Sequence, residues 1–351
     1  MEIKTNNRIE YIDALRGMTM ILVVYSHVAY WCFNNSHLAY NDIFICFRMP
    51  TFFFISGWVF YKIGRTWDKS TICTILKKKF MVQIIPFLVF MLLFVNLFKG
   101  PDYPYSFEDK YGYWFTFSLF EFFVIYIVAE FLLNKQAKNK KEIIVLFLML
   151  LLSITAFFYE QVKFNVHLGI WKPVLTLFSF SKIKYLFFFW LGTFVKKNFA
   201  SFIRLTDNQY LIAACLCLFL ILLWGPDIKT NYITFLLSGI SGTIILFTFF
   251  RKHEAIFSKT NRFGLTLQYI GQRTLDIYLI HYFVLPYHMN YFATWLSQYS
   301  HKTIDMLIIL IISFWIVFIS LLISNIFRLS PFLSHYLFGV NRAAKPDKVT
   351  T

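Results

Sequence analysis

The sequence predicts an all-α, polytopic integral membrane protein with about ten transmembrane helices and both termini in the cytoplasm. Of its 351 residues, 58% are hydrophobic and 15% are charged, whereas soluble domains carry about 25% charged residues. Apolar stretches of about 20 residues, the length that crosses a bilayer, recur along the chain. Basic residues gather in alternate connections between these stretches. The spans use most of the chain, so we expect residues 1–351 to form a single transmembrane domain that ends in a short basic cytoplasmic tail, 328–351.

Ten apolar stretches define the predicted spans in order. They cover residues 11–33, 43–62, 80–98, 112–133, 142–159, 182–197, 209–225, 231–250, 265–287 and 304–327. The sixth is short, and segment 160–181 before it is a candidate for re-entering the membrane. Ten polar residues precede the first stretch, which is too long for the apolar core of a cleavable signal peptide. We therefore expect the first span to stay in the mature protein.

The charge distribution orients the spans. The predicted inner connections, including both termini, hold 23 of the 34 basic residues, and the predicted outer connections hold six. Cytoplasmic loops of membrane proteins carry this excess of Lys and Arg. The net charge of +16 is therefore interpreted as topology, and nucleic acid is not expected as a partner.

The first span carries charged and titratable groups that a bilayer disfavours. Arg16 and His27 are eleven positions apart, which is about three helical turns, so both lie on one face with roughly 16 Å between them along the axis. Charged groups within a span cost several kcal/mol unless they are paired or hydrated, and they mark functional sites. A purely structural pair, satisfied inside the helix bundle, is the alternative.

Further polar residues fall at similar predicted depth. Arg48 lies on the second span, Glu121 on the fourth, and Tyr278 and His281 on the ninth. With His27 they form a predicted cluster suited to removing a proton from a hydroxyl, because an imidazole acts as base and a carboxylate orients it. Two alternatives remain: Glu121 neutralises Arg48, or His281 is a satisfied core histidine.

A second predicted group, nearer the cytoplasm, is cationic. It comprises Arg16, Lys77, Lys78, Lys79 and Arg273. Cations at this depth suit a phosphorylated cytosolic ligand. The sequence contains no phosphate-binding glycine loop and no metal-binding motif, and its five cysteines lack metal-ligand spacing. We predict neither a metal nor a tightly bound cofactor.

Arg16, ten intervening residues and His27 resemble the R-x10-H signature of the integral-membrane acyltransferase family 3, the polysaccharide O-acetyltransferase type. Three further stretches are similar to motifs of that family, in the same order: FRMPTFFFISGWVF (47–60), YWFTFSLFEFF (113–123) and YIGQRTLDIYLIH (269–281). The resemblance covers about 8–330 and includes the ten-helix layout.

This resemblance implies an O-acyltransferase of the inner (cytoplasmic) membrane that modifies cell-envelope glycans. It implies an acyl-CoA co-substrate, most often acetyl-CoA, bound from the cytoplasm, and an acceptor hydroxyl on a surface polysaccharide or a lipid-linked glycan. His27 carries over as base or acyl relay, Arg16 as its essential partner in donor binding, and Ser56-Gly57 as a helix-packing element. We expect Glu121 and His281 to support His27, Arg48 and Tyr278 to contact the acceptor, and the basic group to hold the donor.

One position departs from the family pattern. Two arginines commonly enter the third helix in that family, but this chain has Lys79 followed by Val82 and Gln83. Lysine keeps the charge without the bidentate geometry of a guanidinium. Lys77, Lys78 or Arg65 are expected to share recognition of the CoA phosphates.

A transporter or flippase for a lipid-linked sugar is the alternative function. It would also place charged groups and stacking aromatic rings near the midplane. Matched broken helices in repeated halves, which many transporters contain, are not evident in the sequence.

Overall fold

The computed structural model describes residues 9–33, 41–98, 109–162, 171–225, 227–287, 289–299 and 301–339, and these form helices and short connections without a strand. An all-α fold is thereby confirmed for this part of the chain. Residues 1–8 of the predicted cytoplasmic N-terminus and residues 340–351 of the predicted basic tail lie outside the described residues.

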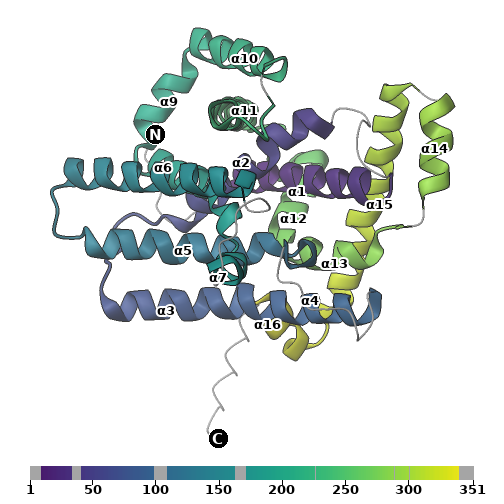
Figure 1. Cartoon of the computed structure of the whole chain (residues 1–351), viewed down its shortest axis with the longest axis horizontal. Helices are drawn as coiled ribbons and strands as arrows, with labels where there is room; N and C mark the ends of the chain where they lie inside the picture. The colour runs from purple at the N-terminus through teal and green to yellow at the C-terminus, as the bar shows by residue number, and fades with distance from the viewer. Residues whose placement is uncertain are drawn as a thin grey trace, which may run out of the picture.

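The described helices follow one another with short connections (Figure 1). In order they are α1 (Glu10–Trp31), α2 (Asn41–Phe60), α3 (Lys69–Lys79), η1 (Phe80–Ile84), α4 (Ile85–Phe98), η2 (Asp109–Gly112), α5 (Trp114–Leu132), α6 (Lys138–Val162), α7 (Trp171–Leu177), η3 (Phe180–Tyr185), α8 (Leu186–Lys197), α9 (Phe199–Asp207), α10 (Gln209–Leu223), α11 (Tyr232–Lys252), α12 (Arg262–Gln272), α13 (Thr274–Val284), α14 (Asn290–Tyr299), α15 (Lys302–Arg328) and α16 (Pro331–Phe338).

Among the described residues, seven helices are long and apolar enough to cross a membrane, and nine spans result if each of two sharply bent pairs is counted as one. The bent pairs are α7 with η3–α8, at 51°, and α9 with α10, at 80°. Every predicted span contains a helix. A multi-pass membrane protein is therefore confirmed, whereas the count of ten and the orientation of the termini stay predictions.

The predicted boundaries differ at two places. Residues 69–79, expected in a cytoplasmic loop, form α3, because the Asp68 side chain caps its first turn by accepting from the Thr71 amide at 3.0 Å. The predicted span 265–287 is broken at Arg273, which leaves helical geometry at φ −110° and ψ 19°. Its two halves, α12 and α13, are each 11 residues long, about 16 Å, which is too short to span a bilayer alone.

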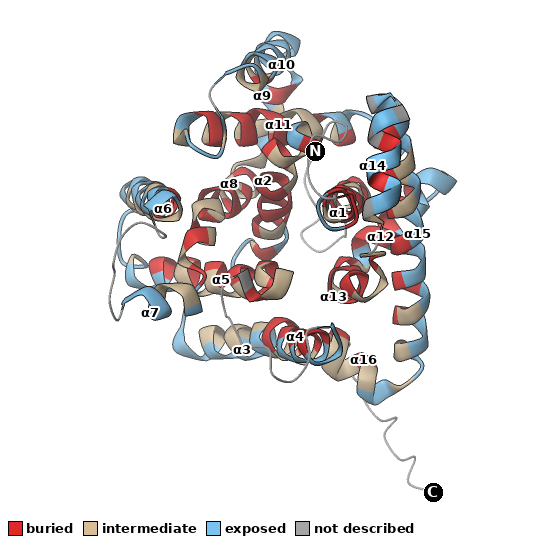
Figure 2. Cartoon of the chain, turned by 45° about the vertical axis from the view of Figure 1, so that its right-hand side comes forward, coloured by how far each residue is buried: buried red, intermediate tan, exposed pale blue. Residues whose placement is uncertain are grey.

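The interior consists mainly of α1, α2, α8 and α13, surrounded by helices with exposed apolar faces (Figure 2). In α1, 83% of the most apolar 18-residue window is buried, compared with 28% in α6. Exposed side chains of α6 include Ile143, Phe147 and Leu151, which share one helix face. Apolar residues that face outward are expected where lipid replaces water as the solvent. The best-buried helix is thus the one that carries Arg16 and His27.

Two pairs of glycines bring the central helices into direct backbone contact. A Cβ atom on Gly17 would lie 2.0 Å from the Leu267 carbonyl oxygen of α12, and one on Gly271 would lie 1.9 Å from the Asp13 carbonyl oxygen of α1. Gly57 and Gly192 join α2 to α8 in the same way. Small residues allow helices in membranes to approach this closely. The packing role expected for the Ser56-Gly57 element agrees with this contact, which holds α2 against α8.

Candidate active site

One face of α1 connects its two functional residues. Arg16, Met20, Val23 and His27 are spaced by four, three and four positions, which places their side chains in one row along the helix. Met20, Val23 and His27 line a narrow cleft together with Met49 and Phe52 of α2 and with Phe115 and Tyr278. The cleft is therefore largely apolar and has the His27 imidazole at one end.

His27 is held by a second imidazole. Its Nδ1 lies 2.7 Å from Nε2 of His281, and the two rings are nearly parallel, at an interplanar angle of 10°. The Nδ1 of His281 lies 3.0 Å from the carbonyl oxygen of Ile277. A carbonyl only accepts, so Nδ1 of His281 carries a hydrogen and, in the neutral ring, Nε2 accepts. His27 must then donate from Nδ1, which leaves its Nε2 with a lone pair.

Two tyrosines line the spaces next to His27: Tyr278 lines the narrow cleft, and Tyr282 lines a second, open cavity. The Tyr282 hydroxyl lies 3.4 Å from Nε2 of His27 and donates to the Gly112 carbonyl oxygen at 3.0 Å. Tyr278 also donates to Gly112, at 2.9 Å, and accepts from the Phe115 amide at 2.9 Å. Tyr278, predicted to contact the acceptor, therefore lines the narrow cleft with its ring while its hydroxyl binds backbone groups.

A cavity of about 550 Å³ opens on the other side of His27. Residues of α1 and α2 line it, including Ser26, Asn41 and Arg48, and so do aromatic residues of other elements, among them Trp114, Tyr282 and Tyr287. The Ser26 hydroxyl donates to Oδ1 of Asn41 at 2.6 Å, which joins α1 to the start of α2. His27, Gly112 and Trp114 line both this cavity and the narrow cleft. His27 thus stands at the junction of two spaces.

The structure brings four predicted residues together and leaves one apart. His27, Tyr278 and Arg48 line one or both spaces and His281 contacts His27, whereas Glu121 lines neither space. Both carboxylate oxygens of Glu121, and Nε and Nη1 of Arg48, are buried without a hydrogen-bond partner among the described residues. The alternative in which Glu121 neutralises Arg48 is therefore wrong. The role expected for Glu121 stays a prediction.

Cations gather around the other end of the α1 row. The charges of Arg16, Lys62, Arg65 and Lys78 all act on the Lys79 ammonium. Lys196, at the end of α8, lies within electrostatic reach of Lys62 and Arg65. We call the following set the basic cluster: Arg16, Lys62, Arg65, Lys78, Lys79 and Lys196.

Local structure fixes the position of Lys79 within the basic cluster. It directly precedes a turn of π-helix, Phe80–Ile84. Pro86 lacks an amide hydrogen and crowds the carbonyl four residues earlier, which favours this widened turn. The Lys79 Nζ lies 4.1 Å from the centroid of the Phe123 ring. This cation–π contact holds the ammonium against α5.

The cations of the basic cluster repel one another. An anion bound among them would relieve this repulsion, so the cluster is a favourable place for an anion. No ion pair links Lys62, Arg65, Lys78, Lys79 or Lys196 to a carboxylate in the described part of the chain. Lys77, also predicted to contact the donor, is an exposed residue of α3. Three of the five predicted donor contacts, Arg16, Lys78 and Lys79, thus belong to the basic cluster.

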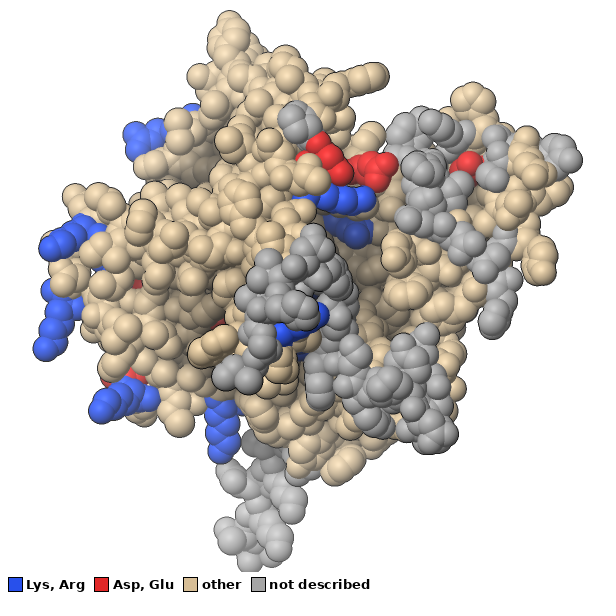
Figure 3. Space-filling view, viewed as in Figure 1, with Lys and Arg blue, Asp and Glu red and all other residues tan. Residues whose placement is uncertain are grey.

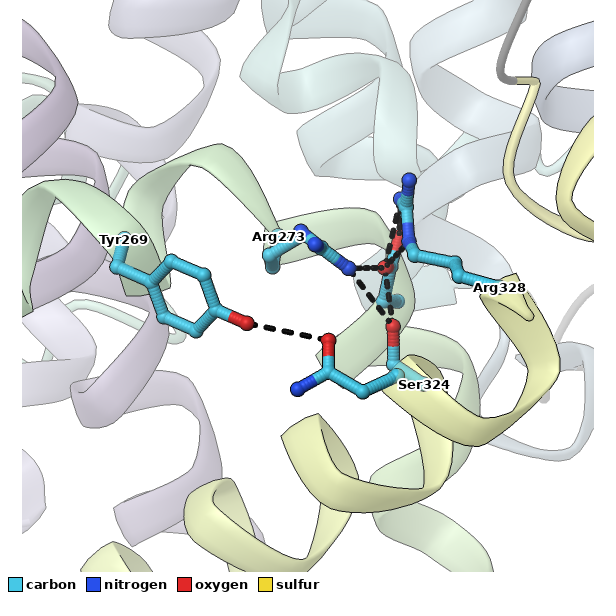
Figure 4. Close-up of polar contacts among 6 residues, drawn as sticks. Tyr269, Arg273, Ser324 and Arg328 are labelled. Carbon is cyan, nitrogen blue, oxygen red and sulfur yellow. Dashed lines mark hydrogen bonds and ion pairs between the residues drawn. The ribbon is translucent and has the colours of Figure 1, made fainter.

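Arg273 lies in a different network (Figure 4). Its Nη1 is 3.4 Å from Oδ2 of Asp276 and 3.3 Å from the Ser324 hydroxyl. Arg328 donates to both oxygens of Asp276, at 2.8 and 3.0 Å. These bonds tie the start of α13 to the end of α15. They indicate a packing role for Arg273, and its predicted donor contact remains untested.

Sequence reasoning missed two residues of the site. Tyr282 reaches His27 but carries no charge and lies in an aromatic run, so nothing in the sequence distinguished it. Lys196 was interpreted as a topological charge, and only the packing of α8 against α2 brings it to the basic cluster. Among the described residues, no three His, Cys, Asp or Glu side chains are grouped as metal ligands.

The fold and the site describe a membrane-embedded helical protein that places a positioned imidazole between an apolar cleft and an open cavity, with the basic cluster at the other end of the α1 row. A family model described as an acyltransferase domain matches residues 9–325. The chain belongs to the integral-membrane acyltransferase family 3. No match was found among curated proteins or among solved structures.

Proposed function

We propose that this acyltransferase is an O-acyltransferase of the inner membrane, which transfers an acyl group, most simply acetyl, from cytoplasmic acyl-CoA to a hydroxyl of a cell-surface or lipid-linked carbohydrate. The observation that carries the proposal is the position of His27. Its imidazole lines both the apolar cleft and the open cavity, so one side chain reaches two substrates that arrive from different directions.

The donor side of the proposal rests on the α1 row. The basic cluster offers several cations to the phosphates of CoA. From Arg16 to His27 the helix rises roughly 16 Å, and the side chains between them, Met20 and Val23, are apolar. An extended pantetheine arm along this row would carry the thioester from the basic cluster to the His27 imidazole.

The chemistry needs one proton carrier. His27 Nε2 accepts the proton of the acceptor hydroxyl as its oxygen attacks the thioester carbonyl carbon, the C–S bond breaks, and the proton passes to the departing CoA thiolate. An acyl relay uses the same nitrogen: Nε2 attacks the thioester carbonyl carbon and the C–S bond breaks to release the CoA thiolate. The acceptor oxygen then attacks the acyl carbon, the bond from that carbon to Nε2 breaks, and the hydroxyl proton passes to the thiolate. In both routes His281 holds the Nδ1 hydrogen of His27 and so directs the lone pair of Nε2 toward the substrates.

The direct test uses purified protein in lipid nanodiscs with acetyl-CoA labelled in the acetyl group and a glycan extract of the host membrane. We expect release of free CoA and transfer of label to the glycan, both dependent on the protein. In sealed proteoliposomes, glycan movement across the bilayer without acetyl-CoA, and with no label transferred, would instead favour the transporter alternative. Label on the protein that hydroxylamine releases, mapped to His27 by mass spectrometry near neutral pH, would select the relay route over the base route.

A further inference from the structure

The open cavity beside His27 is positively charged. Its described lining includes three basic residues, Arg48, Lys182 and Lys229, and one acidic residue, Asp42. Figure 3 shows Lys, Arg, Asp and Glu side chains gathered at the rim of a hollow between α11 and α14. The described lining thus carries more positive than negative charge on the side from which the acceptor would approach.

Arg48 is the most informative of these residues because its guanidinium is incompletely bonded. Its Nε and Nη1 are buried and have no hydrogen-bond partner among the described residues. Leaving a charged donor buried without an acceptor costs free energy of several kcal/mol. Arg48 also lines the cavity, so a ligand that brings negatively charged oxygen atoms there would offset the cost of its buried charge.

Arg48 does not line the narrow cleft. The cleft is lined by its neighbour Met49, whereas Arg48 lines the cavity on the other side of His27. The guanidinium therefore faces the acceptor side of the junction and not the path proposed for the donor. A planar guanidinium is suited to bind a carboxylate or a phosphate through two parallel hydrogen bonds.

A second cation of the cavity, Lys182, lies close to aromatic lining residues. The Lys182 Nζ lies 5.1 Å from the centroid of the Trp114 ring and 4.0 Å from Oε1 of Glu160. Lys229 is an exposed residue of the rim. The aromatic lining includes Trp31, Trp114 and Tyr287. Aromatic rings present flat apolar faces with polar edges, which suits the C–H faces of sugar rings.

We propose that the acceptor is an anionic glycan, whose carboxylate or phosphate group binds Arg48 while a nearby hydroxyl reaches Nε2 of His27. The sugar rings lie along the Trp31, Trp114 and Tyr287 wall, and Lys182 and Lys229 attract the charged chain at the mouth of the cavity. This inference rests on the proposed function, and it adds the chemical class of the acceptor.

The test compares three probes of equal length: a galacturonate hexasaccharide, a phosphorylated maltohexaose and unmodified maltohexaose. Binding is measured by calorimetry on the whole chain in nanodiscs of neutral lipid at low and high salt. We expect at least one anionic probe to bind about tenfold or more tightly than maltohexaose, as a charge-assisted hydrogen bond predicts. Preference for the galacturonate alone identifies acidic sugars, and preference for the phosphorylated probe alone identifies phosphorylated glycans.

Arg48→Gln should remove most of that preference, and Arg48→Lys should restore part of it. Lys172→Gln is the matched control, because it removes one charge from exposed α7 and Lys172 lines neither the cleft nor the cavity. If Arg48→Gln does not fold, Lys182→Gln must weaken binding of the anionic probe more than that of maltohexaose.

Equal affinity for all three probes overturns the inference, and so does an anionic preference that survives Arg48→Gln. Loss of acceptor-independent CoA release in Arg48→Gln, with the probe preference intact, would instead place the guanidinium at the reacting carbonyl. Failure of the proposed function is seen separately, as absence of CoA release from acetyl-CoA by the unmodified protein.

Discussion

The two ends of α1 differ in how they use polar groups. Around Arg16 the structure gathers like charges from α1, α3, α8 and the α2–α3 connection. Around His27 it places a second imidazole, two tyrosine hydroxyls and a cavity. A cluster of fixed cations binds an anion but transfers no proton, whereas a neutral imidazole with a directed lone pair accepts and returns protons. The comparison separates binding at one end from chemistry at the other.

The largest effect is expected at the His27 end. Replacement of His27 by Gln removes the imidazole that lines both the cleft and the cavity, so acyl transfer should fall by about 10²–10⁴-fold. Label transfer from acetyl-CoA measures this loss. His253→Gln is the control, since that histidine is exposed and contacts the Phe249 carbonyl of its own helix. Full transfer by the His27 variant would remove the imidazole from the mechanism.

The second prediction concerns His281 as a positioning residue. His281→Leu leaves Nδ1 of His27 without an acceptor and frees the ring to turn, so kcat should fall on the order of 10²-fold with little change in either KM. A glutamine offers a side-chain oxygen to the same hydrogen. His281→Gln should therefore recover a measurable part of kcat. Equal loss in both variants would indicate that His281 only fills space.

A smaller, binding-specific effect is expected at the other end of α1. Lys79→Gln removes a charge from the centre of the basic cluster, and the KM for acetyl-CoA should rise about tenfold, the cost of one charge-assisted contact. Lys79→Arg should preserve the KM or lower it. Lys77→Gln removes an equal charge from the exposed side of α3 and should change the KM less. If Lys77→Gln and Lys79→Gln raise the KM equally, recognition is spread over α3 and is not centred on the basic cluster.

The smallest effect concerns the cap that orders α3, the helix that presents Lys79. Hydrogen bonds from Thr71 lower the pKa of Asp68 from 3.8 to about 2. The folded-state pKa lies below the unfolded value, so the stabilisation is present above pH 4 and is lost as the pH falls toward 2. Asp68→Ala should speed hydrogen exchange in the first turn of α3 at neutral pH. Unchanged exchange there would show that packing alone orders α3.

Regular features of the site were predictable from the sequence, and contacts between distant elements were not. The row from Arg16 to His27 follows from the helical period, because both residues lie within one uninterrupted apolar run. His281 was recognised as a candidate, but its hydrogen bond to His27 joins residues 254 positions apart and depends on how α13 packs. The break at Arg273 and the π turn before Pro86 are local departures that hydrophobic periodicity does not register. Glu121 was placed in the predicted cluster with His27 and Arg48 because of its similar depth, yet depth does not specify which face of a helix a side chain occupies.

The most direct test of the division along α1 is photolabelling with two acyl-CoA analogues. One carries a photoreactive group on the adenine, and the other carries it on the acyl chain. The adenine probe is predicted to label peptides of the basic cluster, from α3 and the end of α8, and the acyl probe to label peptides around His27, Met49 and Phe52. Labelling of the His27 region by the adenine probe, or the same peptides labelled by both probes, would contradict the assignment of binding and chemistry to opposite ends of one helix.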